Sequence, residues 1–209
     1  IYSVNIADSL IKTGKYKHIL IAASEKLTAM TDYTDRGTCI LFGDGAGSVI
    51  LSASDEPGVR SCNMYGDGSY GELLHMKGMG SVMLSNRGSM PISDNLIKMQ
   101  GSEVFKVAVR MMTEASEKAI DESGLKPENI DFVAPHQANM RIIDAVIKRF
   151  DMPAEKALIN IDKRANTSSA TVPTVLDENI RSGRVKKGDN ILMCAFGGGF
   201  NWGAAVITL

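Results

Sequence analysis

The sequence of 209 residues has few cysteines, few aromatic residues and no excess of charge of either sign. Its 23 Lys and Arg residues stand against 24 Asp and Glu residues, so the net charge is -1. This balance gives no support to nucleic-acid binding or to binding a membrane surface through bulk charge. No apolar run approaches the roughly 20 residues that a transmembrane helix needs. The 44% hydrophobic and 22% charged residues indicate a globular protein with an ordinary core.

The three cysteines, Cys39, Cys62 and Cys194, lie far apart and form no CxxC pair or metal-ligand spacing. An odd, sparse set argues against a disulfide framework and against a cysteine-rich metal site. It fits the reducing cytoplasm better than an oxidising compartment. We therefore expect a cytoplasmic protein with no structural metal.

The sequence also lacks an initiator Met and a residue that could cap its first helix. Ile1, Val4, Ala7 and Leu10 share one face of a helical pattern, and Gly14 is a plausible end for it. Since the pattern is already under way at the first residue, we expect a fragment of a longer protein.

Apolar runs alternate with helical patterns along the chain, which indicates an α/β fold. The continuous run at 18–23 predicts a strand buried on both faces. Further strands are expected at 59–64, 132–134 and 157–161, helices at 101–124, 139–150 and about 171–182, and a hairpin at 190–209. Between 66 and 99 the pattern dissolves into Gly, Ser, Met, Asn and Pro. The loop methionines there could line an adaptable pocket or only fill gaps: Met76, Met79, Met83, Met90 and Met99.

The segment GDGAG at 43–47 is a weak dinucleotide-binding signal. A phosphate-binding loop opens a helix, whereas β-branched and apolar residues follow here. We expect these glycines to allow a close approach of backbone in or beside a strand.

Two polar positions follow predicted strands. His136 follows the run at 132–134, and Asn166 follows the run at 157–161. Because α/β sheets carry their chemistry at the carboxyl ends of strands, we expect both side chains to face one small volume. They would supply donors to an oxygen that becomes negative, and Gly197–Gly199 would let a backbone N–H approach a second oxyanion. A lone His is often a core or surface residue and a triple Gly often a turn, so these residues alone indicate only an α/β enzyme.

Several motifs in fixed order are more specific. They are TDRGT at 34–38, FGDGAG at 42–47, DGSYGELL at 67–74, GSEVFKVAV at 101–109, PHQAN at 135–139, NTS at 166–168 and FGGGF at 196–200 with WG at 202–203. Over residues 1–209 the chain resembles β-ketoacyl-acyl carrier protein synthase III, a thiolase-fold condensing enzyme that starts type II fatty acid synthesis. The resemblance implies a layered αβαβα fold. The end of its N-terminal half would occupy 1–60, a connecting strand and active-site loop 61–100, and its C-terminal half 101–209.

The catalytic set of that family is Cys-His-Asn, and His136 and Asn166 match its His and Asn. The family's Cys lies just upstream of Ile1, while the three cysteines present match other positions and suit small apolar fillers. The resemblance therefore implies that an N-terminal segment of the same protein carries the nucleophile.

The implied reaction is a decarboxylating Claisen condensation. The Cys takes an acyl group from acyl-CoA, with the Gly198 N–H helping to form the oxyanion hole. Malonyl-acyl carrier protein then loses CO₂, and His136, donating through Nε2, and Asn166 hold the enolate that attacks the acyl-enzyme. The product is a 3-oxoacyl-acyl carrier protein. No metal or redox cofactor is implied, since the CoA thioester and the phosphopantetheine thioester are substrates.

The resemblance also assigns binding residues. Arg36 would stack on the CoA adenine and Asn139 would line the pantetheine tunnel. The full set for the substrate is Arg36, Gly101, Phe105, Asn139 and Phe196. Lys106, Arg141, Lys148 and Arg149 would bind the acidic acyl carrier protein, although Lys148 and Arg149 fit a solvated helix face equally well. A homodimer is implied.

Two other functions stay open. One is a thiolase-fold synthase of secondary metabolism that condenses CoA-linked substrates. The other is a non-catalytic acyl-binding or CoA-binding module. The loop between Leu74 and Met99 is longer than in the best-known bacterial form of the family, which leaves the acyl specificity open.

Overall fold

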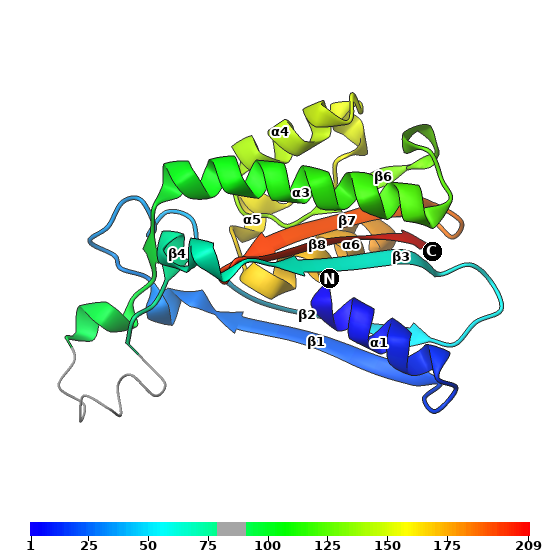
Figure 1. Cartoon of the computed structure of the whole chain (residues 1–209), viewed down its shortest axis with the longest axis horizontal. Helices are drawn as coiled ribbons and strands as arrows, with labels where there is room; N and C mark the ends of the chain where they lie inside the picture. Colours follow the sequence, from blue (N-terminus) through cyan, green and yellow to red (C-terminus); the bar gives the residue numbers. More distant parts are fainter. Residues whose placement is uncertain (79–90) are drawn as a thin grey trace.

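A computed structural model describes residues 1–78 and 91–209, and their elements stack in layers (Figure 1). The helices are α1 (Tyr2–Lys12), α3 (Gly101–Ser123), α4 (Met140–Arg149), α5 (Ile161–Arg164) and α6 (Thr171–Arg181). The strands are β1 (His18–Lys26), β2 (Asp44–Ser52), β3 (Val59–Gly66), β4 (Leu74–His75), β5 (Lys98–Met99), β6 (Phe132–Pro135), β7 (Asn190–Gly197) and β8 (Asn201–Thr208). The short 3₁₀ helices are η1 (Leu27–Met30), η2 (Gly68–Leu73), η3 (Ile92–Asn95), η4 (Pro127–Asn129), η5 (Ala154–Lys156) and η6 (Ser168–Ala170). No helix in the described ranges is long and apolar enough to cross a membrane.

The larger sheet has four strands in the order β3-β8-β7-β6, in which only β6 and β7 run parallel. Helix α3 covers one face with its apolar stripe, and α4 packs beside it (Figure 1). As expected from the sequence, α3 ends at Gly124, which has a φ of 74° that glycine adopts without strain. The buried residues of α3, α4, β7 and β8 form the main core.

Helices α1 and α6 lie between this sheet and a ribbon made of β1 and β2 (Figure 1). The described residues thus form four layers of the expected five, in the order α, β, α, β. The expectation that β1 is buried on both faces was wrong. Its residues alternate between covered and exposed, and the cross-strand partners Leu20 and Ile50 are 65% and 67% exposed. The reason is that no described layer covers the outer face of the ribbon.

The predicted strand at 157–161 is also absent. Ala157 forms one bridge to Val133, and the Leu158 N–H donates to the Val133 carbonyl at 2.8 Å. The chain then leaves the sheet, because the Asn160 N–H bonds the side chain of Gln137 at 3.1 Å and α5 begins at Ile161.

The described part of the segment 66–99 contains short elements. Strand β4 pairs with β5, and Met99 packs against a small core formed around Val104 and Phe200. Met79, Met83 and Met90 lie outside the described residues.

Gly43 approaches other backbone closely, as the sequence predicted, since a Cβ there would stand 3.0 Å from the Arg164 carbonyl oxygen. Gly45 and Gly47 approach side chains. Strand β2 keeps an unbroken register with β1, so there is no bulge in it. A Cβ on Gly45 would stand 2.9 Å from Thr167 Cγ2, and a Cβ on Gly47 would stand 3.0 Å from Pro173 Cγ. These glycines let the segment around Asn166 lie directly against the ribbon.

We predict that Gly45→Ala lowers the free energy of unfolding by about 1–3 kcal/mol, because the buried Thr167 would have to move. Gly58→Ala is the matched control, since a Cβ there meets nothing within 4 Å. Urea denaturation measures both. An equal, small effect for the two variants would contradict the close packing of Gly45.

Candidate active site

A cavity of about 2000 Å³ opens between the four-stranded sheet, the helices α1 and α6, and the ribbon. Ten of the twelve residues assigned to the site from the sequence line it. They are Arg36, Gly101, Phe105, Lys106, His136, Asn139, Arg141, Asn166, Phe196 and Gly198. The other two, Lys148 and Arg149, line a separate groove between α3 and α4 together with Lys106.

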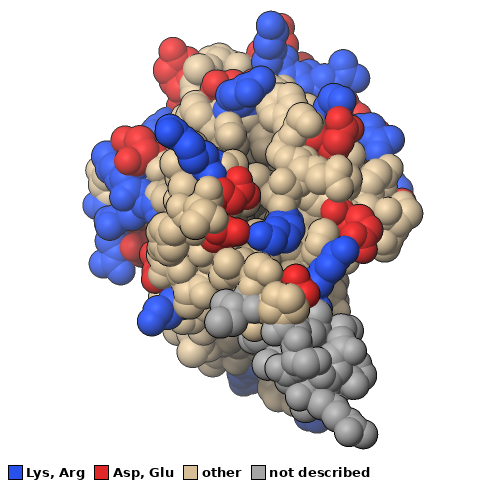
Figure 2. Space-filling view, turned by 90° about the vertical axis from the view of Figure 1, so that its left-hand side faces the viewer, with Lys and Arg blue, Asp and Glu red and all other residues tan. Residues whose placement is uncertain are grey.

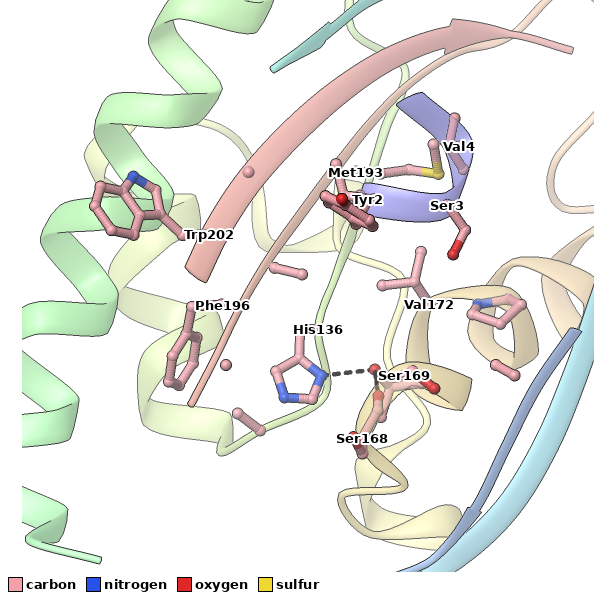
Figure 3. A pocket seen from close by; sticks show the side chains of 18 of the residues that line it. Tyr2, Ser3, Val4, His136, Ser168, Ser169, Val172, Met193, Phe196 and Trp202 are labelled. Carbon is pink, nitrogen blue, oxygen red and sulfur yellow. Dashed lines mark hydrogen bonds between the residues drawn. The ribbon is translucent and has the colours of Figure 1, made fainter. Parts of the chain in front are cut away.

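His136 is the first residue after β6, and its backbone N–H still bonds the Cys194 carbonyl of β7 at 2.8 Å. Its ring lies between Phe196 and the turn at Ser168 and Ser169 (Figure 3). The Phe196 ring meets it edge-on at 5.7 Å between centroids. Nδ1 lies 2.7 Å from the Thr171 hydroxyl. No described residue bonds Nε2, so this nitrogen is left to the cavity.

The hydroxyl of Thr171 determines how Nδ1 is bonded. It donates its proton to the Ser168 carbonyl at 2.9 Å, and a carbonyl can only accept. When it does so, the hydroxyl oxygen accepts from His136, and Nδ1 carries the proton of the neutral ring. Nε2 presents a lone pair in this arrangement, whereas the sequence analysis expected it to donate.

The sequence predicted Asn166 at the end of a strand. Instead it follows the short helix α5, and its backbone is hydrogen-bonded to the segment before β2. Its N–H donates to the Leu41 carbonyl and its carbonyl accepts from the Gly43 N–H, both at 2.9 Å. The side-chain Oδ1 accepts the Ser168 N–H at 2.9 Å. The amide oxygen is therefore occupied, and the Nδ2 group is left as a donor toward the cavity.

Gln137 joins the two segments that carry His136 and Asn166. Its fully buried amide donates to the carbonyls of Pro135 at 2.8 Å and Leu158 at 3.2 Å, and it accepts the Asn160 N–H at 3.1 Å. These bonds replace the backbone ladder that the predicted strand would have made.

Burial lowers the pKa of His136 to about 4. The ring is therefore neutral at physiological pH. A neutral ring has one N–H, which makes its position on Nδ1 or Nε2 decisive for the chemistry.

Gly198 lies in the turn between β7 and β8 and lines the cavity. A Cβ there would stand 3.3 Å from the Leu74 carbonyl oxygen, so a larger residue would press on β4.

Local hydrogen bonds and ring contacts hold several of the residues assigned to substrate binding. Arg36 is exposed on a loop braced by Asp35, which accepts the Gly37 N–H at 2.8 Å. Asn139 caps α4, since its Oδ1 accepts the Arg141 N–H at 2.9 Å. The Arg141 guanidinium lies 5.2 Å from the centre of the Phe105 ring, which places a cation at the edge of the cavity.

The residues assigned to the carrier protein form a mixed surface. Lys106 pairs with Glu103 at 2.8 Å and Arg149 with Glu117 at 3.8 Å. Figure 2 shows the left-hand side of the molecule of Figure 1, where basic and acidic side chains are interspersed among uncharged residues. Any attraction for an acidic partner is thus local.

The three cysteines are free thiols, and none lines the described part of the cavity. Burial raises the pKa of Cys194 to about 12 and also raises that of Cys62. Within the described residues, no group of three His, Cys, Asp or Glu side chains is placed to hold a metal ion.

Two family models match the chain. "3-Oxoacyl-[acyl-carrier-protein (ACP)] synthase III" matches residues 1–68, and the model of the C terminal of the same synthase matches residues 120–209. Beta-ketoacyl-[acyl-carrier-protein] synthase III of Aquifex aeolicus is 45% identical over 208 residues, which is 99% of this chain and 62% of that protein. This chain belongs to the 3-oxoacyl-[acyl-carrier-protein] synthase III family.

Solved structures agree with the thiolase-like fold of the synthase III family. The 3-oxoacyl-[acyl-carrier-protein] synthase III of Aquifex aeolicus superposes with a TM-score of 0.89 at 44% identity, over 100% of this chain and 63% of that one. The priming beta-ketosynthase from the R1128 polyketide biosynthetic pathway gives 0.92 at 32% identity, over 100% and 62%. The chain spans 62–63% of the length of the curated relatives that it matches.

The sequence analysis of this synthase III family member missed Ser168 and Thr171. The backbone of Ser168 serves both catalytic candidates, because its N–H holds Asn166 and its carbonyl accepts from Thr171. The only sequence signal was the NTS motif, and Thr171 lies outside it.

The turn that carries Asn166 is strained. Ala165 has a φ of 59° with a ψ of −166°, a region that glycine alone adopts readily, and Ser168 has a φ of 51°. We predict that Ala165→Gly raises the free energy of unfolding by about 1 kcal/mol, since relief of strain exceeds the entropy cost of glycine. Ala46→Gly, in the regular strand β2, is expected to lower it by about 0.5–1 kcal/mol. Destabilisation by both variants, measured in urea, would argue against strain at Ala165.

The pKa of His136 also predicts a pH dependence of stability. Between pH 6.5 and about 4 the unfolded chain binds a proton at His136 that the folded chain excludes, so stability falls as the pH falls. The loss is about 3 kcal/mol over this window. His136→Asn cannot titrate but keeps a donor for Thr171. We expect the difference in free energy of unfolding between the wild type and this variant to change by that amount between pH 7 and pH 4. Parallel pH profiles would contradict a neutral, buried His136.

Proposed function

We propose that this chain supplies the enolate-stabilising part of a β-ketoacyl-acyl carrier protein synthase III. The reaction is the decarboxylating condensation of an acyl-CoA primer with malonyl-acyl carrier protein to a 3-oxoacyl-acyl carrier protein. The observation that carries the proposal is the shared turn at Ser168. It orients the amide of Asn166 and the ring of His136 from two distant segments, so that both reach one cavity.

In the proposed reaction, the C–C bond to the malonyl carboxylate breaks and releases CO₂. The electron pair moves onto the thioester, whose oxygen becomes negative, and the Asn166 Nδ2 group donates to that oxygen. His136 acts on the same oxygen through Nε2. The enolate carbon then attacks the acyl carbonyl and releases the cysteine thiolate. Asn166 and the Nε2–H form of His136 are neutral donors in a buried site, which suits a charge that exists only during the reaction.

The other assignments are part of the same proposal. The Gly198 N–H stabilises the oxyanion of acyl transfer, and its place at the cavity wall supports this role. Arg36, Gly101, Phe105, Asn139 and Phe196 bind the CoA and phosphopantetheine arms, which enter as substrates, and the chemistry calls for no metal or redox cofactor. Lys106, Arg141, Lys148 and Arg149 contact the acyl carrier protein.

The nucleophile is proposed to come from an N-terminal segment of the same protein. Two observations support this: the chain covers 62–63% of its relatives' length, and the ribbon exposes apolar residues on its outer face. The assembled enzyme is proposed to be a homodimer. The free thiols support action in the reducing cytoplasm.

A chimera tests the proposal. In it, this sequence replaces the matching 208 residues of the Aquifex aeolicus relative, and condensation of acyl-CoA with malonyl-acyl carrier protein is measured. We predict that Asn166→Ala and His136→Ala each lower decarboxylation by about 10²–10³-fold, because each removes a donor to the enolate oxygen. Acylation of the cysteine, followed by mass spectrometry, should stay measurable.

His18→Ala is the control, since His18 is exposed and bonds only Ser52 among the described residues. Equal loss of both half-reactions in the His136 and Asn166 variants would contradict the division of roles. The 209-residue chain alone should gain no acyl group from acyl-CoA.

The structural match to a polyketide priming ketosynthase favours one second candidate, a synthase of secondary metabolism. That enzyme would condense CoA-linked substrates. Equal or faster condensation of malonyl-CoA than of malonyl-acyl carrier protein by the chimera would favour it.

A further inference from the structure

The side chain of Thr171 is buried, and its hydroxyl is restricted to two hydrogen-bond neighbours. It is the first residue of α6, it is 1% exposed, and its hydroxyl touches both Nδ1 of His136 and the Ser168 carbonyl. One hydroxyl has one proton, so it can donate to only one of these two neighbours at a time.

The Ser168 carbonyl does not depend on the hydroxyl alone. It also accepts the backbone N–H of Thr171. If the hydroxyl turned toward His136, this carbonyl would keep the bond from the Thr171 N–H. The hydroxyl would then make one hydrogen bond instead of two, so the second arrangement is accessible but the first is favoured at rest.

The two arrangements give His136 opposite roles. With the hydroxyl donating to Ser168, Nδ1 carries the proton and Nε2 offers a lone pair to the cavity. With the hydroxyl donating to Nδ1, the ring proton must be on Nε2, which becomes a donor. The exchange takes up one proton at Nε2 from cavity water and releases one from Nδ1 to water, so the net charge is unchanged.

We propose that Thr171 is a positioning residue whose hydroxyl decides which ring nitrogen of His136 carries the proton. The resting protein holds the Nδ1–H form. The donor form, which the enolate requires, arises when the hydroxyl turns from Ser168 to His136. The tautomer assignment stands on the hydrogen bonds alone, while its catalytic consequence rests on the proposed function.

Nitrogen-15 NMR of the histidine rings tests the tautomer directly. The chain has three histidines, and the signal of His136 is the one lost in His136→Asn. We expect a protonated Nδ1 and an unprotonated Nε2 in the wild type and in Thr171→Ser, which keeps the hydroxyl. Thr171→Val cannot accept from Nδ1–H, so its ring should shift to the Nε2–H form. An Nε2–H ring in the wild type, or the same tautomer in the wild type and Thr171→Val, would overturn the proposal.

The chimera provides a second measurement. Thr171→Val should lower kcat for malonyl decarboxylation about 10–100-fold with KM unchanged, because its ring, although in the Nε2–H form, has lost the hydrogen bond from Thr171 that orients it. Thr171→Ser should restore it to within about threefold. A proportional loss in both variants would mark a merely structural role and overturn the proposal. If the tautomers behave as expected while no variant and no wild type condenses substrate, the proposed function fails and the positioning role of Thr171 stands.

Discussion

The buried amide of Gln137 is the interaction on which the geometry of the site depends. His136 is attached to a sheet strand, whereas Asn166 lies thirty residues later on a segment that has left the sheet. Backbone pairing between these segments ends at Leu158. Beyond that residue the amide of Gln137 supplies the hydrogen bonds that hold them together. Each of its three bonds satisfies a backbone group that would otherwise be buried without a partner, at a cost of about 1–3 kcal/mol each. The registration of α5 against β6, and with it the position of Asn166, follows from that requirement.

The ribbon of β1 and β2 holds the segment that carries Asn166 from the side opposite Gln137. Asn166 is bonded to backbone at Leu41 and Gly43, and the Glu25 carboxylate of β1 accepts from the hydroxyl and N–H of Ser169. These contacts require the segment to lie against β2, and the glycines of β2 make that approach possible. The site therefore lies where the four-stranded sheet, helix α6 and the ribbon of β1 and β2 meet. Its left-handed residues persist because this frame determines the turn from both sides.

Local signals in the sequence predicted much of this fold. The structure confirmed the helix at 101–124, the strand at 132–134 and the closing hairpin. The helix could be predicted because it has a long apolar stripe and ends at a glycine. The strand and the hairpin could be predicted because turn residues bound them. The strand at 157–161 was wrong because its pairing is replaced by the side chain of Gln137, twenty residues away. The burial of β1 was wrong because an apolar run does not show which layers the chain contains. His136 and Asn166 were identified from sequence motifs. Their orientation depends on Ser168 and Thr171 meeting His136 across thirty or more residues, and no spacing in the sequence reports that.

The same geometry decides which thiol can act with His136. Cys194 is the nearest in register, since it pairs with Pro135 and its carbonyl accepts the His136 N–H. However, it packs in the core with Ala115 and Val146, where burial raises its pKa to about 12. Bringing this thiol to the cavity would require β7 to slip by one residue, which would turn every core side chain of that strand to the opposite face. The two neutral groups at the cavity can stabilise a negative oxygen, and they have no nucleophile of their own in the described residues. In the proposed reaction, the thiol that acts with His136 and Asn166 therefore comes from another segment of the protein.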